Sequence, residues 1–130
     1  MIVVTSDSSR ALVKAHMSGF LNPDEVEGFN ADKEAAVEAM GLRSGEFYLL
    51  VDTSDCIIQS QEVVAAFIGA VLNTRYKSKR LAVVRHDNLT RMQTRRILIV
   101  RDDTAMFESM KDAEEWLFSG NSDQAWWVAA

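Results

Sequence analysis

The first eighteen residues comprise an apolar run, a polar turn and a segment in which polar and apolar residues alternate. Residues 2–5 form a β-branched run, and residues 6–9, Ser-Asp-Ser-Ser, have the composition of a turn. Between residues 10 and 18 the side chains Ala11, Val13, Ala15 and Met17 would share one face of a strand. The pattern predicts an N-terminal β-hairpin whose Ala11 face points toward the core.

Helical periodicity begins after this hairpin. Asn22 is suited to cap a helix whose first residue is Pro23, and apolar side chains recur at helical spacing through the following turns. Gly41 predicts a Schellman-type end to this helix. The same reasoning predicts further helices that start at Ser60, near residue 88 and at Ser109.

Short continuous apolar runs fill the intervals between these helices. Residues 47–51 and 81–84 are typical of strands buried on both faces, and residues 105–107 predict a last short strand. Residues 97–100 could form a strand instead of the end of the third helix. Strands and helices therefore alternate after the hairpin, which is typical of an α/β fold. We expect a mostly parallel sheet of about five strands and about four helices.

The length of 130 residues fits one domain. We expect this domain to span residues 1–120 and to be followed by a tail, residues 121–130, that carries Trp126 and Trp127. Two tryptophans in a short tail rarely remain in water, because each carries a large apolar area. We expect them to pack back on the domain or to cover a neighbouring subunit, and we favour the second.

Acidic and basic residues are separated along the chain. The net charge is −5, with ten acids and two bases between Asp24 and Glu62, but nine bases and one acid between Arg75 and Arg101. The overall acidity argues against a nucleic-acid-binding protein, whose domain is normally basic. Cys56 is the single cysteine, the N-terminus lacks the pattern of a signal peptide, and no apolar run has the roughly 18 residues that a membrane helix needs. We expect a soluble cytoplasmic protein with no integral membrane association.

The basic segment includes three arginines of the third predicted helix, Arg91, Arg95 and Arg96. Arg91 and Arg95 lie one turn apart and would share a face. Such a helix suits an anionic lipid headgroup, a phosphorylated ligand, an acidic partner or the acidic helix of a second copy. An ordinary solvated surface that is neutralised within the chain explains the pattern equally well.

Polar residues follow the two inner strands, at the edge where open parallel sheets bind ligands. They are Asp52, Ser54, Asp55 and Cys56 after the first strand and His86, Asp87 and Asn88 after the second. They would form a small polar pocket, in which Asp52 and His86 suggest acid–base chemistry. We favour the reading that these residue types satisfy turns, because no nucleophilic triad, phosphate loop or metal-ligand spacing accompanies them. We therefore expect no catalytic residue, no metal and no cofactor.

Several segments, taken in order, resemble the STAS superfamily, and most closely its SpoIIAA-like members, which are grouped with STAS/SEC14-type domains. The matching segments are residues 13–26, 49–52 (Leu-Leu-Val-Asp), 80–84 (Arg-Leu-Ala-Val-Val), 105–107 and 113–117 (Ala-Glu-Glu-Trp-Leu). The similarity spans roughly residues 11–118 and rests on the order and spacing of these segments. It implies the STAS/SpoIIAA-like form of the α/β fold.

The resemblance also implies a role for Ser60. In anti-sigma factor antagonists of the STAS group, a serine at the start of the helix after the central strand is phosphorylated, which switches partner binding. Ser60 matches this position when counted from Asp52 with a loop one residue shorter, but Gln59-Ser60-Gln61 replaces the Asp-Ser and following Gly of those antagonists. A plain helix cap, which stabilises by about 1 kcal/mol, is the reading that we favour over a phosphorylation site.

These features favour a non-enzymatic regulatory or protein-interaction module whose partner is another protein or a second copy of the chain. The SEC14-type kinship implies an alternative, a carrier or sensor of a small lipid-like or anionic ligand, which requires a cavity between the sheet and its helices. A third reading is a small enzyme that uses Asp52 and His86.

Overall fold

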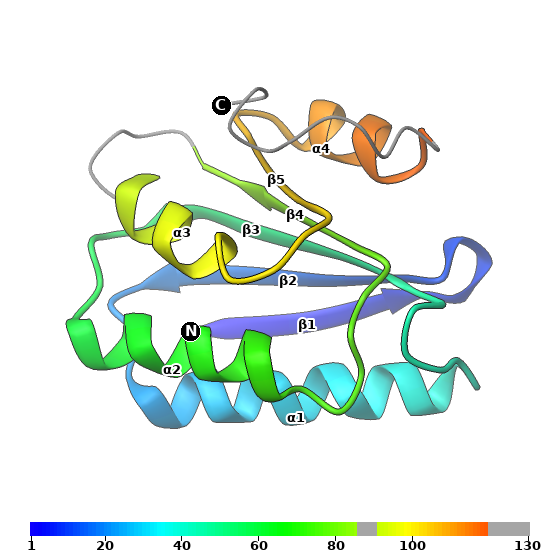
Figure 1. Cartoon of the computed structure of the whole chain (residues 1–130), viewed down its shortest axis with the longest axis horizontal. Coiled ribbons are helices and arrows are strands. Elements are labelled where there is room, and N and C mark those ends of the chain that lie inside the picture. Colours follow the sequence, from blue (N-terminus) through cyan, green and yellow to red (C-terminus); the bar gives the residue numbers. More distant parts are fainter. Residues whose placement is uncertain (86–90, 120–130) are drawn as a thin grey trace.

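The computed structural model describes residues 1–85 and 91–119 of the chain (Figure 1). The strands are β1 (Ile2–Asp7), β2 (Leu12–Gly19), β3 (Tyr48–Cys56), β4 (Arg80–Val84) and β5 (Thr104–Phe107). The helices are α1 (Pro23–Ala39), α2 (Gln61–Asn73), α3 (Arg91–Leu98) and α4 (Met110–Leu117), and a 3₁₀ turn, η1 (Ser8–Arg10), joins the first two strands.

The strands form one sheet in the order β1-β2-β3-β4-β5. β1 pairs antiparallel with β2, whereas β2–β3, β3–β4 and β4–β5 are parallel pairs. A helix lies between the two strands of each parallel pair in the sequence, as a crossover connection requires. This arrangement confirms the predicted α/β fold with an N-terminal hairpin and a mostly parallel sheet.

Helix α1 begins and ends where its sequence predicts. Asn22 Oδ1 accepts a hydrogen bond from Glu25 N at 2.9 Å, and Asn22 N donates to Glu25 Oε1 at 3.2 Å, which forms a capping box. At the other end Gly41 has a φ of 70°, and Leu42 N donates to Val37 O at 3.2 Å. This is the predicted Schellman end, and its left-handed residue is a glycine because a Cβ would be strained there.

The two faces of the sheet are covered by different helices. Helices α1, α2 and α3 lie on the face that includes Leu49, Val51 and Leu81 (Figure 1). Helix α4 packs on the opposite face against β3, β4 and β5, where the Phe118 ring meets Tyr48 edge-on at 5.0 Å. The alternation of side chains along β3 separates these two layers.

The third predicted helix is confirmed as a helix over Arg91–Leu98, and residues 99–103 are not a strand. Its expected start near Asn88 lies outside the described residues, as do His86 and the tail with Trp126 and Trp127. In the part of the chain that the structure describes, no helix is long and apolar enough to cross a membrane.

Candidate functional site

The predicted polar pocket differs from the observed arrangement. Asp52, Ser54 and Asp55 belong to β3 itself, so the expectation that they follow the strand in a loop is wrong. β3 is longer than its apolar run because its polar half continues to pair with β2 as far as Gly19. The apolar run therefore predicted only the part of β3 that is buried on both faces, which ends at Val51.

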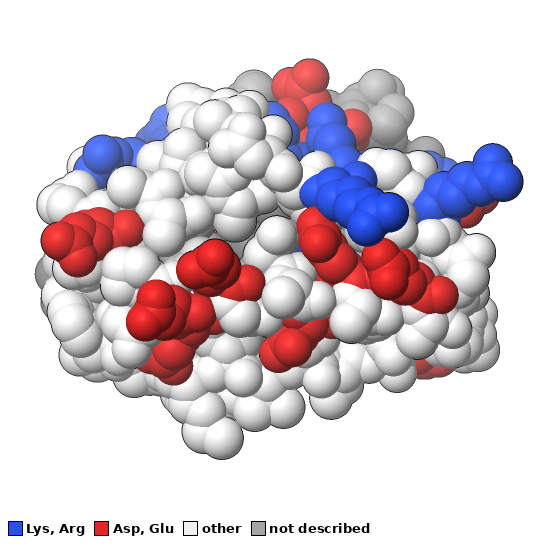
Figure 2. Space-filling view, turned by 90° about the horizontal axis from the view of Figure 1, so that it is seen from below, with Lys and Arg blue, Asp and Glu red and all other residues white. Residues whose placement is uncertain are grey.

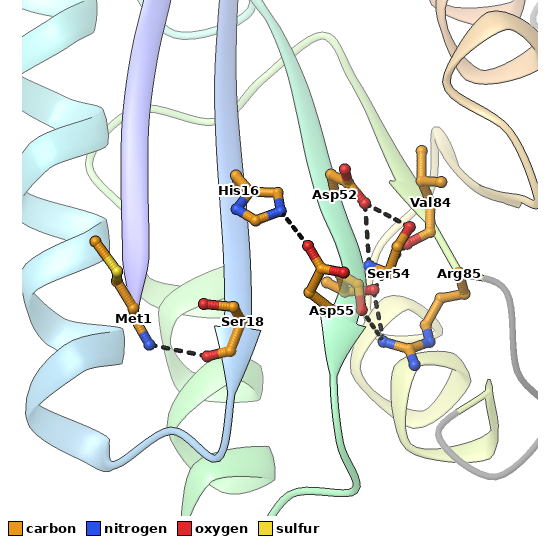
Figure 3. Close-up of polar contacts among 9 residues, drawn as sticks. Met1, His16, Ser18, Asp52, Ser54, Asp55, Val84 and Arg85 are labelled. Atoms are coloured by element: carbon orange, nitrogen blue, oxygen red, sulfur yellow. Dashed lines mark hydrogen bonds and ion pairs between the residues drawn. The ribbon is translucent and has the colours of Figure 1, made fainter.

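A β-bulge brings the polar side chains of β3 to one face. His16 pairs with Asp52 and Ser18 with Asp55, so β3 has one residue more than β2 in this interval. The extra residue resets the alternation, and Asp55 points toward His16 (Figure 3). His16 Nε2 lies 2.8 Å from Asp55 Oδ2, and Asp52 Oδ1 accepts hydrogen bonds from Ser54 N and Ser54 Oγ at 3.0 and 2.6 Å.

These contacts are those of a stabilised bulge on an exposed surface. The His16 and Asp55 side chains are 48% and 65% accessible, and exposed ion pairs contribute at most about 1 kcal/mol. The bond from Ser54 N to Asp52 Oδ1 satisfies one backbone N–H of the bulge. The proposed pairing of Asp52 with His86, and the part assigned to Asn88, stay predictions because residues 86–90 lie outside the described ranges.

Cys56 ends β3 as a buried free cysteine. Burial raises the pKa of its thiol, which disfavours the nucleophilic thiolate. Within residues 1–85 and 91–119, no group of three or more His, Cys, Asp or Glu side chains is placed to hold a metal ion.

Ser60 is the N-cap of α2, as the sequence predicts. Its Oγ accepts a hydrogen bond from Val63 N at 3.2 Å, and its side chain is half-buried. The loop before it and the turn after β2 place three large apolar side chains at the surface: Ile57 and Ile58 on the loop and Phe20 on the turn, which are 56%, 54% and 60% exposed. We call these three residues the apolar edge. Sequence reasoning missed them, because an exposed apolar residue in a loop has no periodicity that marks it.

Gln59 fixes the loop that carries the apolar edge. Its Oε1 accepts from Leu21 N at 2.8 Å, and its Nε2 donates to Gly19 O at 2.9 Å, which ties residues 57–60 to the turn that carries Phe20. Its backbone N donates to Gln93 Oε1 at 2.8 Å, and its carbonyl accepts from Gln93 Nε2 at 2.7 Å. Helix α3 is therefore joined to the start of α2 by a reciprocal pair of hydrogen bonds.

One arginine of α3, Arg96, lies beside this loop. Arg95 and Arg96 are exposed and Arg91 is half-buried. Arg96 Nη1 donates to Gln61 Oε1 at 3.3 Å, which places it at the first turn of α2. The surface around the start of α2 thus combines apolar and cationic side chains.

Other members of the basic segment have structural roles. Arg80 is 5% exposed, donates to Trp116 O at 2.6 Å and lies over the Trp116 ring, so it fastens α4 to the sheet. Arg75 forms an ion pair with Glu38 at 3.5 Å, on a helix whose exposed face is rich in acidic side chains (Figure 2). Part of the basic segment is therefore matched by α1 within the same chain.

A cavity of about 110 Å³ lies between the sheet and helices α1, α2 and α3. Its walls are mainly apolar and include Met17, Leu49, Val51, Leu81 and Val83 of the sheet and Phe29, Phe67, Val71 and Ile97 of the helices. The rings of Phe29 and Phe67 meet edge-on at 6.5 Å and bridge α1 and α2. Since Phe67, Val71 and Ile97 are only half-buried, the cavity approaches the surface where α2 and α3 meet.

Polar groups gather at one end of this cavity. Lys33 is only 5% exposed and lines the cavity together with Asn30, Thr74 and Arg101. Lys33 Nζ donates to Thr74 Oγ1 at 2.6 Å, and no carboxylate of the described residues forms an ion pair with it. Asn30 Oδ1 is buried and has no hydrogen-bond partner in the described part of the chain. We call Asn30, Lys33, Thr74 and Arg101 the cationic end.

The two basic groups at the cationic end keep their protons although burial lowers the pKa of each. Burial lowers the pKa of Lys33 to about 8, while Glu34 raises it and Arg101 lowers it by smaller amounts. Burial also lowers the pKa of Arg101, whose guanidinium donates to Ser78 O at 2.9 Å. Both side chains remain protonated at pH 7, so this end of the cavity is positive.

Comparison with known proteins identifies the fold. No protein-family model matches the chain, and no curated protein matches its sequence significantly. An uncharacterized DUF3478-family protein with a SpoIIAA-like fold, from Shewanella loihica PV-4, is 20% identical, with 90% of this chain and 92% of that chain covered and a TM-score of 0.64. The anti-sigma factor antagonist SpoIIAA in its unphosphorylated form is 13% identical, with 93% of this chain and 100% of that chain covered and a TM-score of 0.58. The chain has a SpoIIAA-like fold, as the resemblance of its segments implies.

Proposed function

We propose that this chain is a non-enzymatic protein-interaction module that binds its partner through the apolar edge. The observation that carries the proposal is the exposure of Phe20, Ile57 and Ile58 on two segments that Gln59 ties together. Large apolar side chains that are grouped and held in place mark contact sites, because their burial by a partner gains free energy without much ordering of the loop.

The neighbouring charges define the partner. Arg96 lies at the first turn of α2, next to the loop that carries Ile57 and Ile58, so the complementary surface is apolar with an acidic group at its rim. Ser60 lies between the two features as the cap of α2. A phosphate on Ser60 would add a charge of about −1.5 to −2 at this border and would weaken the attraction of an acidic partner. SpoIIAA, which shares the fold, is an anti-sigma factor antagonist solved in its unphosphorylated form, which agrees with a regulatory role of this kind.

The test is affinity capture from an extract of the source organism with matched bait variants. The Ile57→Ser/Ile58→Ser bait should lose a protein that the wild-type bait retains. The control bait Leu72→Ser/Ile99→Ser removes two apolar residues that are 59% and 62% exposed elsewhere, and it should retain that protein. Equal capture by both variants contradicts the proposal. Sedimentation velocity of the wild type and the first variant shows whether the partner is a second copy of the chain.

The cavity favours a second candidate function, the binding of a small apolar or amphiphilic ligand. Its walls are mostly apolar, and its volume is comparable with the roughly 150 Å³ of an engineered cavity that admits benzene. Native mass spectrometry of the freshly purified protein should show added mass on the wild type. Val71→Trp, which fills the cavity, should abolish the added mass, whereas the change of its exposed neighbour, Leu72→Trp, should leave it. A wild-type protein without added mass opposes this function.

A further inference from the structure

Lys33 lies on the buried face of α1, where the other buried residues are apolar. The buried residues of α1 are Val26, Phe29, Lys33 and Val37, which recur at helical spacing. A lysine at such a position commonly extends its ammonium to solvent. Here the whole side chain is 5% exposed, and it lines the cavity. The charge is therefore turned inward, where burial without a counter-ion is costly.

The hydrogen-bonding groups at this end are incompletely matched. An ammonium has three N–H donors, and Thr74 Oγ1 accepts one of them. Thr74 Oγ1 itself donates to Tyr76 O at 3.1 Å, so its single O–H is already engaged. Asn30, one turn before Lys33, has a buried Oδ1 with no partner among the described residues. Two N–H groups of Lys33 and the Oδ1 of Asn30 thus have no partner among the described residues, at one end of a cavity whose walls are mainly apolar.

We propose that the cavity binds a small amphiphilic carboxylic acid, whose carboxylate accepts hydrogen bonds from Lys33 Nζ and whose tail lies against Leu49, Leu81 and Phe67. The proposal rests on the second candidate function and names its ligand class. A carboxylate supplies both the counter-charge and the acceptors that Lys33 lacks, and the guanidinium of Arg101 adds to the positive potential. The cavity volume suits a tail of about six carbons.

Titration of the ¹⁵N-labelled full chain at pH 7 with hexanoate and with 1-hexanol tests the ligand class. These probes share a tail and differ in the charge of the head. Wild type should bind hexanoate about tenfold or more tightly than 1-hexanol, since a hydrogen bond to a charged group contributes roughly 1.5–3 kcal/mol. Lys33→Met should lose this preference while it retains 1-hexanol. Lys111→Met, which removes an exposed lysine of α4 on the opposite face of the sheet, should behave as the wild type.

The possible failures are distinguishable. Equal binding of both probes, or unchanged hexanoate binding by Lys33→Met, overturns the ligand class but leaves the cavity as a binding site. Binding of neither probe to the wild type overturns the ligand class and opposes the second candidate function as well. If hexyl phosphate binds more tightly than hexanoate, the headgroup of the ligand is a phosphate ester, and the proposal of a carboxylic acid is overturned. The amide spectrum of Lys33→Met verifies that the variant is folded.

Discussion

Replacing Lys33 by methionine is expected to stabilise the empty protein. Methionine has a similar length and shape, fits the apolar part of the cavity and carries no charge. The interval between the ordinary lysine pKa of 10.5 and the value of about 8 in the folded protein corresponds to about 3 kcal/mol, at 1.36 kcal/mol per pH unit. The lost hydrogen bond to Thr74 offsets about 1 kcal/mol. The net gain in the free energy of unfolding at pH 7 should be about 2 kcal/mol.

The pH dependence gives the sharper measurement. Between pH 8 and 10.5 the unfolded chain holds a proton on Lys33 that the folded chain has released, so the stability of the wild type rises with pH in this window. The methionine variant lacks this contribution, and its advantage should shrink by about 2 kcal/mol between pH 7 and 9.5. The charged groups that act on Lys33 are Glu34 of the same helix and Arg101 after α3. The pKa of nearby Tyr76 is raised, so this phenol stays protonated up to pH 9.5.

Urea denaturation of wild type, Lys33→Met and Lys111→Met at both pH values measures these differences. Lys111 is exposed, and its replacement should change stability by less than about 0.5 kcal/mol at either pH. A variant that is less stable than the wild type at pH 7, or a difference that is constant between pH 7 and 9.5, refutes the conclusion that Lys33 is buried without a counter-ion.

Three further changes test the local physics of the fold. Ser60→Ala should lower the free energy of unfolding by about 1 kcal/mol through loss of the bond to the first turn of α2, and Ser60→Thr should restore most of it, as urea denaturation will show. Leu50→Ala should cost about 2–5 kcal/mol in the same assay, because Leu50 is 1% exposed in the centre of the sheet. The pKa of Asp7 is lowered to about 2 by hydrogen bonds from Ser9 and Arg10, so Ser9→Ala should raise it toward 3.8 in an NMR titration; an unchanged value would show that Arg10 alone sets it.

Local rules in the sequence were sufficient wherever a single turn or a single periodicity decides the structure. The ends of α1 follow from Asn22 and Gly41, because a cap and a left-handed residue act on their immediate neighbours. The hairpin and the buried strands follow from alternation and from continuous apolar runs. The polar half of β3 escaped this reasoning, since its pairing is set by the register against β2 and by a bulge, neither of which leaves a local pattern.

The candidate site could be predicted from the sequence less well than the fold, because it depends on contacts between distant segments. The pairing of His16 with Asp55 joins residues 39 positions apart. The bonds of Gln59 to Leu21 and to Gln93 join three separate loops and helices. Lys33 did leave a signal: it lies four residues after Phe29 and four before Val37, on the apolar stripe of its helix. A charged residue at such a position indicates either a solvent-reaching side chain or a buried charge, and only the packed structure distinguishes them.

The two proposed binding sites, the apolar edge and the cavity, share one pair of hydrogen bonds. Gln59 and Gln93 line the cavity, and the same two residues hold the loop of the apolar edge against α3. A ligand that displaced α3 from the sheet would lengthen these bonds, and a partner bound to Ile57 and Ile58 would contact the same loop. Each event would then change the free energy of a conformational element on which the other depends. By thermodynamic linkage, whatever factor the ligand imposes on the affinity for the partner, the partner imposes on the affinity for the ligand.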